Sequence, residues 1–178
     1  MIEKHKSDFR KSCIKRLKFK SHFAKIKKDK IIVDKLIKTI YTLKPKRLLL
    51  YIPMELEVNI LPLINRLRRE RKIEVFVPYM HGDSFKAVKY RLPLNRKKFG
   101  IREPHNSFYK RKIDIAIVPV VGIDGIYKRI GFGAGMYDRF FDRLNYKPTL
   151  IFTQIVLCKT SRILSNKYDI QADYVITS

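Results

Sequence analysis

The apolar positions of the chain recur at helical spacing in its first quarter. Residues 4–20 carry one apolar stripe, and residues 32–43 carry a second that ends shortly before Pro45. The stripes are formed by Phe9, Cys13, Ile14 and Leu17, and by Ile32, Leu36, Ile40 and Leu43. Apolar side chains three and four positions apart share one face of a helix. The pattern therefore predicts two amphipathic helices at the start of the chain.

From residue 48 onward, short apolar runs alternate with further helical patterns. The runs at 48–52, 73–77, 113–121, 149–155 and 174–177 predict strands, 58–67 and 136–144 predict helices, and 85–90 predicts an antiparallel strand. Strands that take turns with helices are typical of a largely parallel sheet covered on both faces. No repeat or linker divides the 178 residues, which suffice for one core. We therefore expect a single three-layer α/β/α domain over residues 1–178, with a largely parallel central sheet.

The segment 122–144, GIDGIYKRIGFGAGMYDRFFDRL, carries the strongest functional signal. Three glycines alternate through a turn between a predicted strand and a predicted helix. Bare backbone N–H groups at the positive end of a helix dipole hold phosphate oxygens, and Asp138, inside that helix, is placed to reach a magnesium ion on them. The spacing matches neither the dinucleotide fingerprint nor the P-loop. A turn whose glycines serve only close packing is the alternative, but the adjacent Lys128 and Arg129 favour phosphate.

A rim of candidate ligands follows from the predicted sheet, because open α/β sheets bind ligands at the carboxyl ends of their strands. The residues just past these ends are 53–57, Pro78 and Tyr79, the glycine turn, and Gln154. Glu55 and Glu57 thereby become candidates for binding a polar substrate. The alternative is a solvated first helical turn, where carboxylates are favoured by the helix dipole.

The charge of the chain is strongly positive, with 40 Lys and Arg against 16 Asp and Glu and a formal net charge of +24. Such an excess points to nucleic acid, anionic lipid surfaces, or phosphorylated and polycarboxylate small molecules. The lysines are spread from Lys4 to Lys167, which favours a solvated surface over a dedicated nucleic-acid site.

No stretch reaches the ~18 apolar residues of a membrane span, and the first residues lack a signal-peptide core. We expect a cytoplasmic protein with no membrane partner.

The cysteines and histidines give no sign of a metal centre. Cys13 and Cys158 are the only cysteines, far apart and without metal-ligand spacing, and the four histidines form no cluster. We expect two free thiols that act as small apolar residues in a reducing compartment.

Taken together, these residues resemble the 5-formyltetrahydrofolate cyclo-ligase family, also called methenyltetrahydrofolate synthetases, almost end to end. The resemblance begins with Lys6-x-x-x-Arg10 and runs through YIPMELEV, Val77-Pro78 and FGIREP at 99–104. It peaks in VPVVGIDGIYKRIGFGAGMYDRFF and closes with Gln154 and Asp169-x-x-x-Asp173. The family's central block, D-x-x-G-x-R-L-G-x-G-K-G-Y-Y-D, is specific, whereas the other pieces would mean little alone.

The resemblance implies a role for each matching residue. The ATP-binding set is Lys6, Arg10, Arg129, Gly131, Gly133, Ala134, Gly135, Met136 and Tyr137. The folate-binding set is Ile52, Glu57, Phe132 and Tyr137. Asp138 and Asp169 match the magnesium carboxylates, and Arg129 and Asp138 are the expected catalytic residues. By spacing alone, Lys6 and Arg10 would be two more charges on a solvated helix face.

One departure from the family pattern concerns the turn itself. Ala134 stands where lysine is typical, and Met136 where tyrosine is usual. A lysine beside the transferred phosphoryl group stabilises developing charge by ~3 kcal/mol. Its loss is compatible with a slow enzyme, a different substrate, or replacement of the charge by Lys128 or another lysine.

The implied reaction is ATP- and Mg²⁺-dependent ring closure of 5-formyltetrahydrofolate, with or without a polyglutamate tail, to 5,10-methenyltetrahydrofolate, ADP and phosphate. We expect a monomer that acts on these small molecules. The alternative is a basic α/β protein that binds RNA or another polyanion on the same scaffold, with weak or lost catalysis. Glu57, Asp138 and Asp169 separate the two hypotheses, because a polyanion binder gains nothing from carboxylates at its rim.

Overall fold

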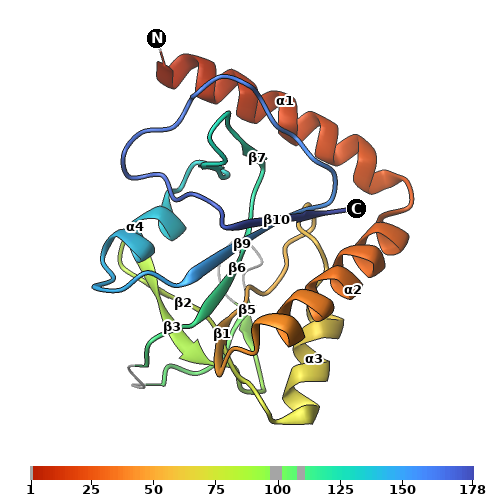
Figure 1. Cartoon of the computed structure of the whole chain (residues 1–178), viewed down its shortest axis with the longest axis vertical. Coiled ribbons are helices and arrows are strands. Elements are labelled where there is room, and N and C mark those ends of the chain that lie inside the picture. The colour runs from red at the N-terminus through yellow and green to blue at the C-terminus, as the bar shows by residue number, and fades with distance from the viewer. Residues whose placement is uncertain (1, 97–101, 108–110) are drawn as a thin grey trace.

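The fold is an α/β sandwich in which helices cover both faces of a central sheet (Figure 1). It is described by a computed structural model over residues 2–96, 102–107 and 111–178. The helices are α1 (Ile2–His22), α2 (Lys25–Leu43), α3 (Leu61–Glu70) and α4 (Met136–Asp142). Within the described residues, no helix combines the length and apolarity that crossing a membrane requires.

The central sheet has six strands in the order β10-β9-β6-β1-β2-β3. These are β1 (Arg47–Leu49), β2 (Glu74–His81), β3 (Ser84–Lys89), β6 (Ile115–Pro119), β9 (Thr149–Gln154) and β10 (Tyr174–Thr177). All neighbours pair in parallel except β2 and β3, which form the expected antiparallel pair. Two small antiparallel pairs join β4 (Asn95–Arg96) to β5 (Arg102–Glu103) and β7 (Gly122–Ile123) to β8 (Arg129–Ile130). The predicted fold class is confirmed.

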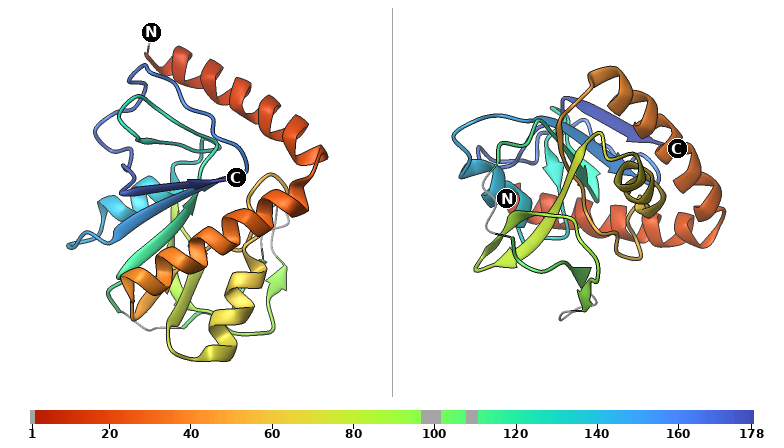
Figure 2. Two further views of the ribbon diagram at one scale, coloured as in Figure 1. Left: turned by 45° about the vertical axis from the view of Figure 1, so that its right-hand side comes forward. Right: turned by 90° about the horizontal axis from the view of Figure 1, so that it is seen from below.

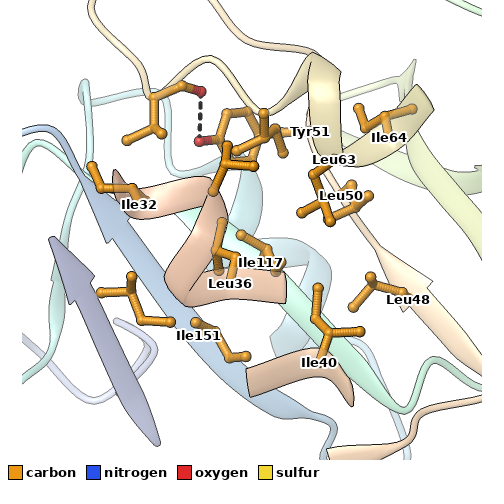
Figure 3. Packing of buried hydrophobic residues seen from close by; sticks show 14 of the residues in the cluster. Ile32, Leu36, Ile40, Leu48, Leu50, Tyr51, Leu63, Ile64, Ile117 and Ile151 are labelled. Carbon is orange, nitrogen blue, oxygen red and sulfur yellow. Dashed lines mark hydrogen bonds between the residues drawn. The ribbon is translucent and has the colours of Figure 1, made fainter. Parts of the chain in front are cut away.

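The two faces of the sheet bury different cores. On one face, the aliphatic stripes of α2 and α3 pack against β1, β6 and β9 (Figure 3). The labelled members are Ile32, Leu36, Ile40, Leu48, Leu50, Tyr51, Leu63, Ile64, Ile117 and Ile151. On the other face, α4 packs through an aromatic cluster in which Phe85 stacks on Phe140 at 4.3 Å between ring centroids. The glycine turn, residues 131–135, directly precedes α4, which packs on this face of the sheet.

The predicted element boundaries shift where local turn contacts compete with apolar spacing. The helix expected from residue 58 begins at Leu61, because the Asn59 side chain accepts a hydrogen bond from the Leu61 N–H in a local turn and Pro62 follows in the first turn of the helix. Leu43, counted in the second stripe, is 37% exposed. Of the motif FGIREP at 99–104, residues 99–101 lie outside the described residues.

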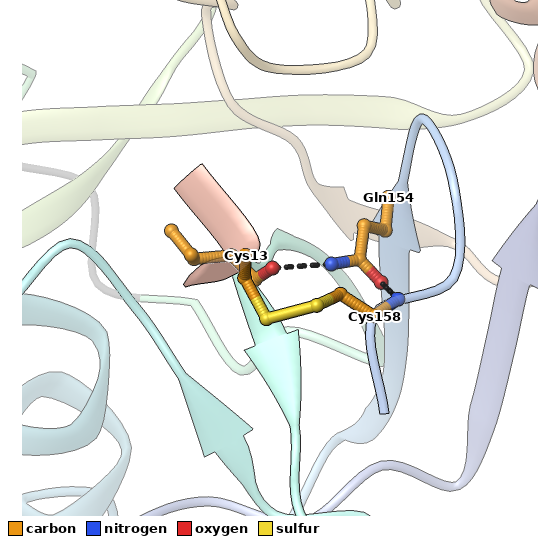
Figure 4. Close-up of a disulfide and its surroundings, with 4 residues drawn as sticks. Cys13, Gln154 and Cys158 are labelled. Carbon is orange, nitrogen blue, oxygen red and sulfur yellow. Dashed lines mark hydrogen bonds between the residues drawn. A yellow bond between two sulfur atoms is a disulfide. The ribbon is translucent and has the colours of Figure 1, made fainter. Parts of the chain in front are cut away.

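The prediction of two free thiols is wrong, because Cys13 and Cys158 form a disulfide with their Cα atoms 5.8 Å apart (Figure 4). Cys13 lies on the buried stripe of α1, and Cys158 follows β9. Gly122 makes room for the bond, since a Cβ at this position would lie 2.9 Å from Phe9 and 3.0 Å from the Cys13 sulfur. The two cysteines are 145 positions apart, so no local sequence pattern indicated that they are close in space.

Candidate functional site

The glycine turn connects β8 to α4 and projects into solvent at its tip. Gly133 and Gly135 have φ values of +115° and +63°, which side-chain-bearing residues rarely adopt. Phe132, Gly133 and Ala134 are exposed, and Gly135 precedes the first residue of α4. The backbone of the turn is therefore accessible from solvent at its tip.

Three guanidinium groups surround this turn. Arg10 of α1 donates from Nε to the Gly131 carbonyl at 2.8 Å, and its guanidinium also lies beside Gly133. Arg129 of β8 packs so tightly against Gly131 that a Cβ there would lie 2.5 Å from it. Arg139 of α4 donates to the Ala134 carbonyl. These groups come from separate elements, so the fold concentrates positive charge where phosphate was expected.

Two carboxylates lie beside these cations, each in a buried ion pair. Arg129 Nη1 lies 3.1 Å from Asp138 Oδ2, and Lys6 Nζ lies 2.6 Å from Asp169 Oδ2. The four side chains are only 7–13% exposed. The Ile170 N–H donates to Asp138 Oδ1, which ties the two pairs together through adjacent residues. Because an unpaired buried charge is costly, each cation neutralises a carboxylate in the free protein.

The two carboxylates at these pairs could supply part of the coordination of a metal ion, with a bound ligand supplying the rest. Among the described residues, no group of three or more His, Cys, Asp or Glu side chains could enclose a metal ion. Magnesium is commonly held by one or two carboxylates together with waters and substrate phosphates. Asp138 and Asp169 fit that arrangement, and they do not fit an all-protein cage.

Glu57 and Tyr137 lie near Arg129 and form the less polar part of the site. Burial raises the pKa of Glu57, although the Met54 N–H, which donates to Glu57 Oε2 at 2.8 Å, and the charges of Arg129 and Lys25 oppose the shift. Burial, followed by the nearby Glu57 charge, raises the pKa of Tyr137 far above its ordinary value, so its phenol stays neutral. The Arg129 guanidinium lies 4.9 Å from the centroid of the Tyr137 ring. Glu55, the other candidate, is exposed.

Other candidate residues pack against the core or bond within the protein. Ile52 and Tyr79 are partly buried against the aliphatic core, and Met136 against the aromatic one. Gln154 uses both ends of its amide within the protein, donating to the Val121 carbonyl and accepting from the Cys158 N–H (Figure 4). Lys128 donates to the Asn166 carbonyl at 2.6 Å, so its ammonium is engaged by another loop rather than by the turn.

Sequence reasoning missed two residues that shape the site. Asp83, in the turn between β2 and β3, holds Arg139 through its carbonyl and pairs with Arg143 through its carboxylate. Asp124 is fully buried and accepts hydrogen bonds from the loop that precedes Arg129 and from Ser165. Burial raises the pKa of Asp124, but these hydrogen bonds outweigh burial and lower it. Asp124 stands in the glycine-rich motif, whereas nothing in the sequence linked Asp83 to Arg139.

Comparison with known proteins gives a consistent result over the whole chain. The family model described as the 5-formyltetrahydrofolate cyclo-ligase family matches residues 2–178. A 5-formyltetrahydrofolate cyclo-ligase of Mycoplasma pneumoniae is 26% identical over 173 residues, covering 96% of this chain and 97% of the relative. One of Haemophilus influenzae is 30% identical over 103 residues, covering 53% and 54%.

Solved structures share the fold. A 5,10-methenyltetrahydrofolate synthetase of Mycoplasma pneumoniae superposes with a TM-score of 0.72 at 22% identity, covering 96% of this chain and 97% of the other. One of Aquifex aeolicus gives a TM-score of 0.76 at 25% identity, covering 97% and 89%. The agreement extends over almost the full length of each chain.

Proposed function

Because the chain belongs to the 5-formyltetrahydrofolate cyclo-ligase family, an ATP-dependent ligase family, we propose that it converts 5-formyltetrahydrofolate and ATP to 5,10-methenyltetrahydrofolate, ADP and phosphate. The observation that carries the proposal is the meeting of two buried ion pairs and three guanidinium groups at one exposed glycine turn. Charges placed in this way suit the triphosphate of ATP.

The triphosphate would lie on residues 131–137, with its oxygens facing Lys6, Arg10 and Arg129. Arginine binds phosphate through paired N–H groups, and lysine binds it as a point charge. Arg129 is 6% exposed and also donates to the Pro119 carbonyl, a hydrogen bond that does not involve Asp138. This bond limits the ordering that phosphate binding would require.

Magnesium would be held by Asp138 and Asp169 together with phosphate oxygens, and it would neutralise charge on the phosphates. In the free protein these carboxylates are bonded to Arg129 and Lys6. We infer an exchange of counter-ions, in which Lys6 and Arg129 turn from carboxylate to phosphate and leave carboxylate oxygens for the cation. The exchange keeps every buried charge paired in both states.

The chemistry then needs alignment and charge neutralisation rather than a protein nucleophile. The formyl oxygen attacks the γ-phosphorus, an O–P bond forms, and the bond from that phosphorus to the bridging oxygen breaks to release ADP. N10 next adds to the activated formyl carbon and loses its proton. The C–O bond breaks and phosphate leaves with the electron pair. Arg129 would stabilise the charge that develops on the transferred group.

The folate would be bound on the side of Arg129 that carries Glu57 and Tyr137. The buried Glu57 carboxyl offers a directional partner for pterin N–H groups, since its raised pKa reflects a poorly solvated position. Ile52 and the 41%-exposed Phe132 would contribute apolar contact. Glu57 and Arg129 are close enough for their charges to interact, so both substrates would lie beside one guanidinium.

The test is the ATP-dependent formation of methenyltetrahydrofolate, followed by its near-ultraviolet absorbance. Asp138→Asn should lower turnover at least about a hundredfold, because it removes a metal ligand and the partner of Arg129. Asp142→Asn, an exposed carboxylate on the same helix, is the matched control and should retain turnover. Full activity of the Asp138→Asn enzyme would refute the metal assignment.

A second experiment addresses the alternative of a polyanion binder. Asp138 and Asp169 support the ligase, because carboxylates at a phosphate site weaken nucleic-acid binding unless a cation accompanies them. Filter binding with single-stranded RNA should therefore be weak and strongly salt-dependent. Tight RNA binding without ATP-dependent product would favour the binding protein.

A further inference from the structure

The corner where α1 meets α2 carries an exposed apolar tip that the proposed reaction does not use. Phe19, Phe23 and Ile26 are 61%, 56% and 88% exposed, and they lie within eight consecutive positions. Phe19 cannot join the core, because it stands two positions after the buried Leu17 and so points to the opposite side of the helix. Phe19 therefore stays on the solvent side of α1.

Basic residues surround this tip. Residues 11–30 include Lys11, Lys15, Arg16, Lys18, Lys20, Lys25, Lys27, Lys28 and Lys30, against the single acidic residue Asp29. Asp29 is buried and paired with Lys25 at 2.7 Å, so it neutralises Lys25 and leaves the other basic residues of this segment in excess. The first turn of α2 has no acidic residue and its N-cap has no side-chain hydrogen bond, which adds the positive end of the helix dipole. The corner combines apolar contact with strong positive potential.

We propose that this corner, formed by Phe19, Phe23, Ile26 and the surrounding lysines, docks the protein on an anionic lipid bilayer surface. Apolar side chains on a basic helical element enter the boundary between headgroups and acyl chains. Long lysine side chains extend toward anionic headgroups while their stems cover apolar surface. The sequence-based expectation of no membrane partner rested on spanning segments, and surface docking requires none.

The arrangement of the rings favours lipid over nucleic acid as the occupant. Bases stack on open aromatic faces. Phe19 and Phe23 instead pack edge to face at 5.4 Å, the His22 ring packs against Phe23, and the Lys20 ammonium lies 5.6 Å above the Phe19 ring. The most exposed member of the tip is Ile26, an aliphatic residue that cannot stack. The boundary between headgroups and acyl chains can accommodate Phe19, Phe23 and Ile26 alike.

The corner is far enough from the phosphate turn for both to operate together. Arg10 and Phe19 are separated by about 13 Å along α1, from the helical rise per residue. Figures 1 and 2 show the junction of α1 and α2 on the opposite side of the molecule from α4. Docking would therefore leave the turn open to ATP and folate.

Vesicle sedimentation tests the proposal without reference to catalysis. The whole protein should pellet with vesicles of equal parts phosphatidylglycerol and phosphatidylcholine and not with phosphatidylcholine alone. Phe23→Ser/Ile26→Ser should weaken this binding about tenfold or more. Leu92→Ser/Ile163→Ser, which removes two other exposed apolar side chains, is the matched control and should bind as the wild type does. Unchanged turnover would show that both variants fold.

A single-tryptophan probe locates the contact, since the chain has no tryptophan of its own. Emission from Phe23→Trp should shift to the blue on anionic vesicles and be quenched by brominated lipid, whereas Ile163→Trp should show neither change. Equal vesicle binding by wild type and Phe23→Ser/Ile26→Ser would overturn the proposal. So would wild type that fails to pellet, or a patch variant that loses only affinity for single-stranded RNA.

Discussion

The two ends of α1 have similar composition and entirely different surroundings. In the amino-terminal half, Lys6 is 6% exposed and paired with Asp169, and Arg10 is bonded to the Gly131 carbonyl. In the carboxyl-terminal half, Lys15 and Lys18 face solvent. A net charge of +24 therefore does not identify a site, because exposed charges contribute little and buried charges require partners. Burial and pairing distinguish the phosphate end from the surface end.

Removing the disulfide that fixes the middle of α1 should give the largest effect. The bond closes a loop with a sequence separation of 145, and such a cross-link stabilises a fold by about 4 kcal/mol, mainly by restricting the unfolded chain. Dithiothreitol should lower the thermal unfolding midpoint of the wild type. Cys13→Ser/Cys158→Ser should unfold at the lower midpoint with or without reductant. Identical midpoints for all samples would show that the cross-link contributes nothing.

Substituting one arginine at each end of α1 tests their contrast directly. Arg10→Met should reduce kcat/KM for ATP about a hundredfold, or about 2.7 kcal/mol, because a cation beside the turn is lost. Arg16→Met removes an exposed guanidinium from the same helix and should change kcat/KM by less than about twofold. Steady-state kinetics with ATP varied at saturating folate measure both variants. Equal effects of the two substitutions would contradict the difference proposed between the two ends of α1.

Local regularities made the fold predictable from the sequence. Cys13 and Leu17 on α1, like Leu36 and Ile40 on α2, are four positions apart. All four are buried, as this helical spacing predicts. Alternating strands and helices predicted the parallel sheet, and the glycines predicted a turn before α4. At the start of α3, where the observed boundary differs from the predicted one, the Leu61 N–H donates to the Asn59 side chain.

Long-range pairing was not predictable from the residues alone. Lys6 and Asp169 are 163 positions apart, and Arg139 meets Asp83 across 56 positions. The spacing of Lys6 and Arg10 is equally compatible with a solvated face, and only the resemblance to a family singled them out. The disulfide escaped prediction for the same reason, since no local pattern brings the middle of α1 to the segment after β9.

Placing lysine at the glycine turn should have a smaller effect than removing Arg10. Ala134 is exposed, so Ala134→Lys fits without disturbing the core. Arg10, Arg129 and Arg139 already surround the turn. We expect the rate to be preserved or raised by at most about tenfold. Turnover by the variant measures this, and a clear fall would contradict a role for this position near phosphate.

The smallest expected effect is a pH dependence of stability at Glu57. Because burial raises the pKa of Glu57 above its usual 4.5, the folded protein retains a proton that the unfolded chain has lost. The wild type should therefore lose stability relative to Glu57→Gln as the pH rises from below 4.5 through the raised pKa. Denaturant titrations across this range measure the difference, with the exposed Glu55→Gln as control. If the wild type instead gained stability relative to Glu57→Gln as the pH rises, the predicted direction of the pKa shift would be contradicted.

The exchange of counter-ions at the glycine turn is tested most directly by a crystal structure with magnesium and a non-hydrolysable ATP analogue. We predict phosphate oxygens bonded to Lys6, Arg10 and Arg129, and the metal bonded to Asp138 and Asp169. A complex in which residues 131–135 contact no phosphate, while the Lys6–Asp169 and Arg129–Asp138 pairs remain intact, would contradict the account.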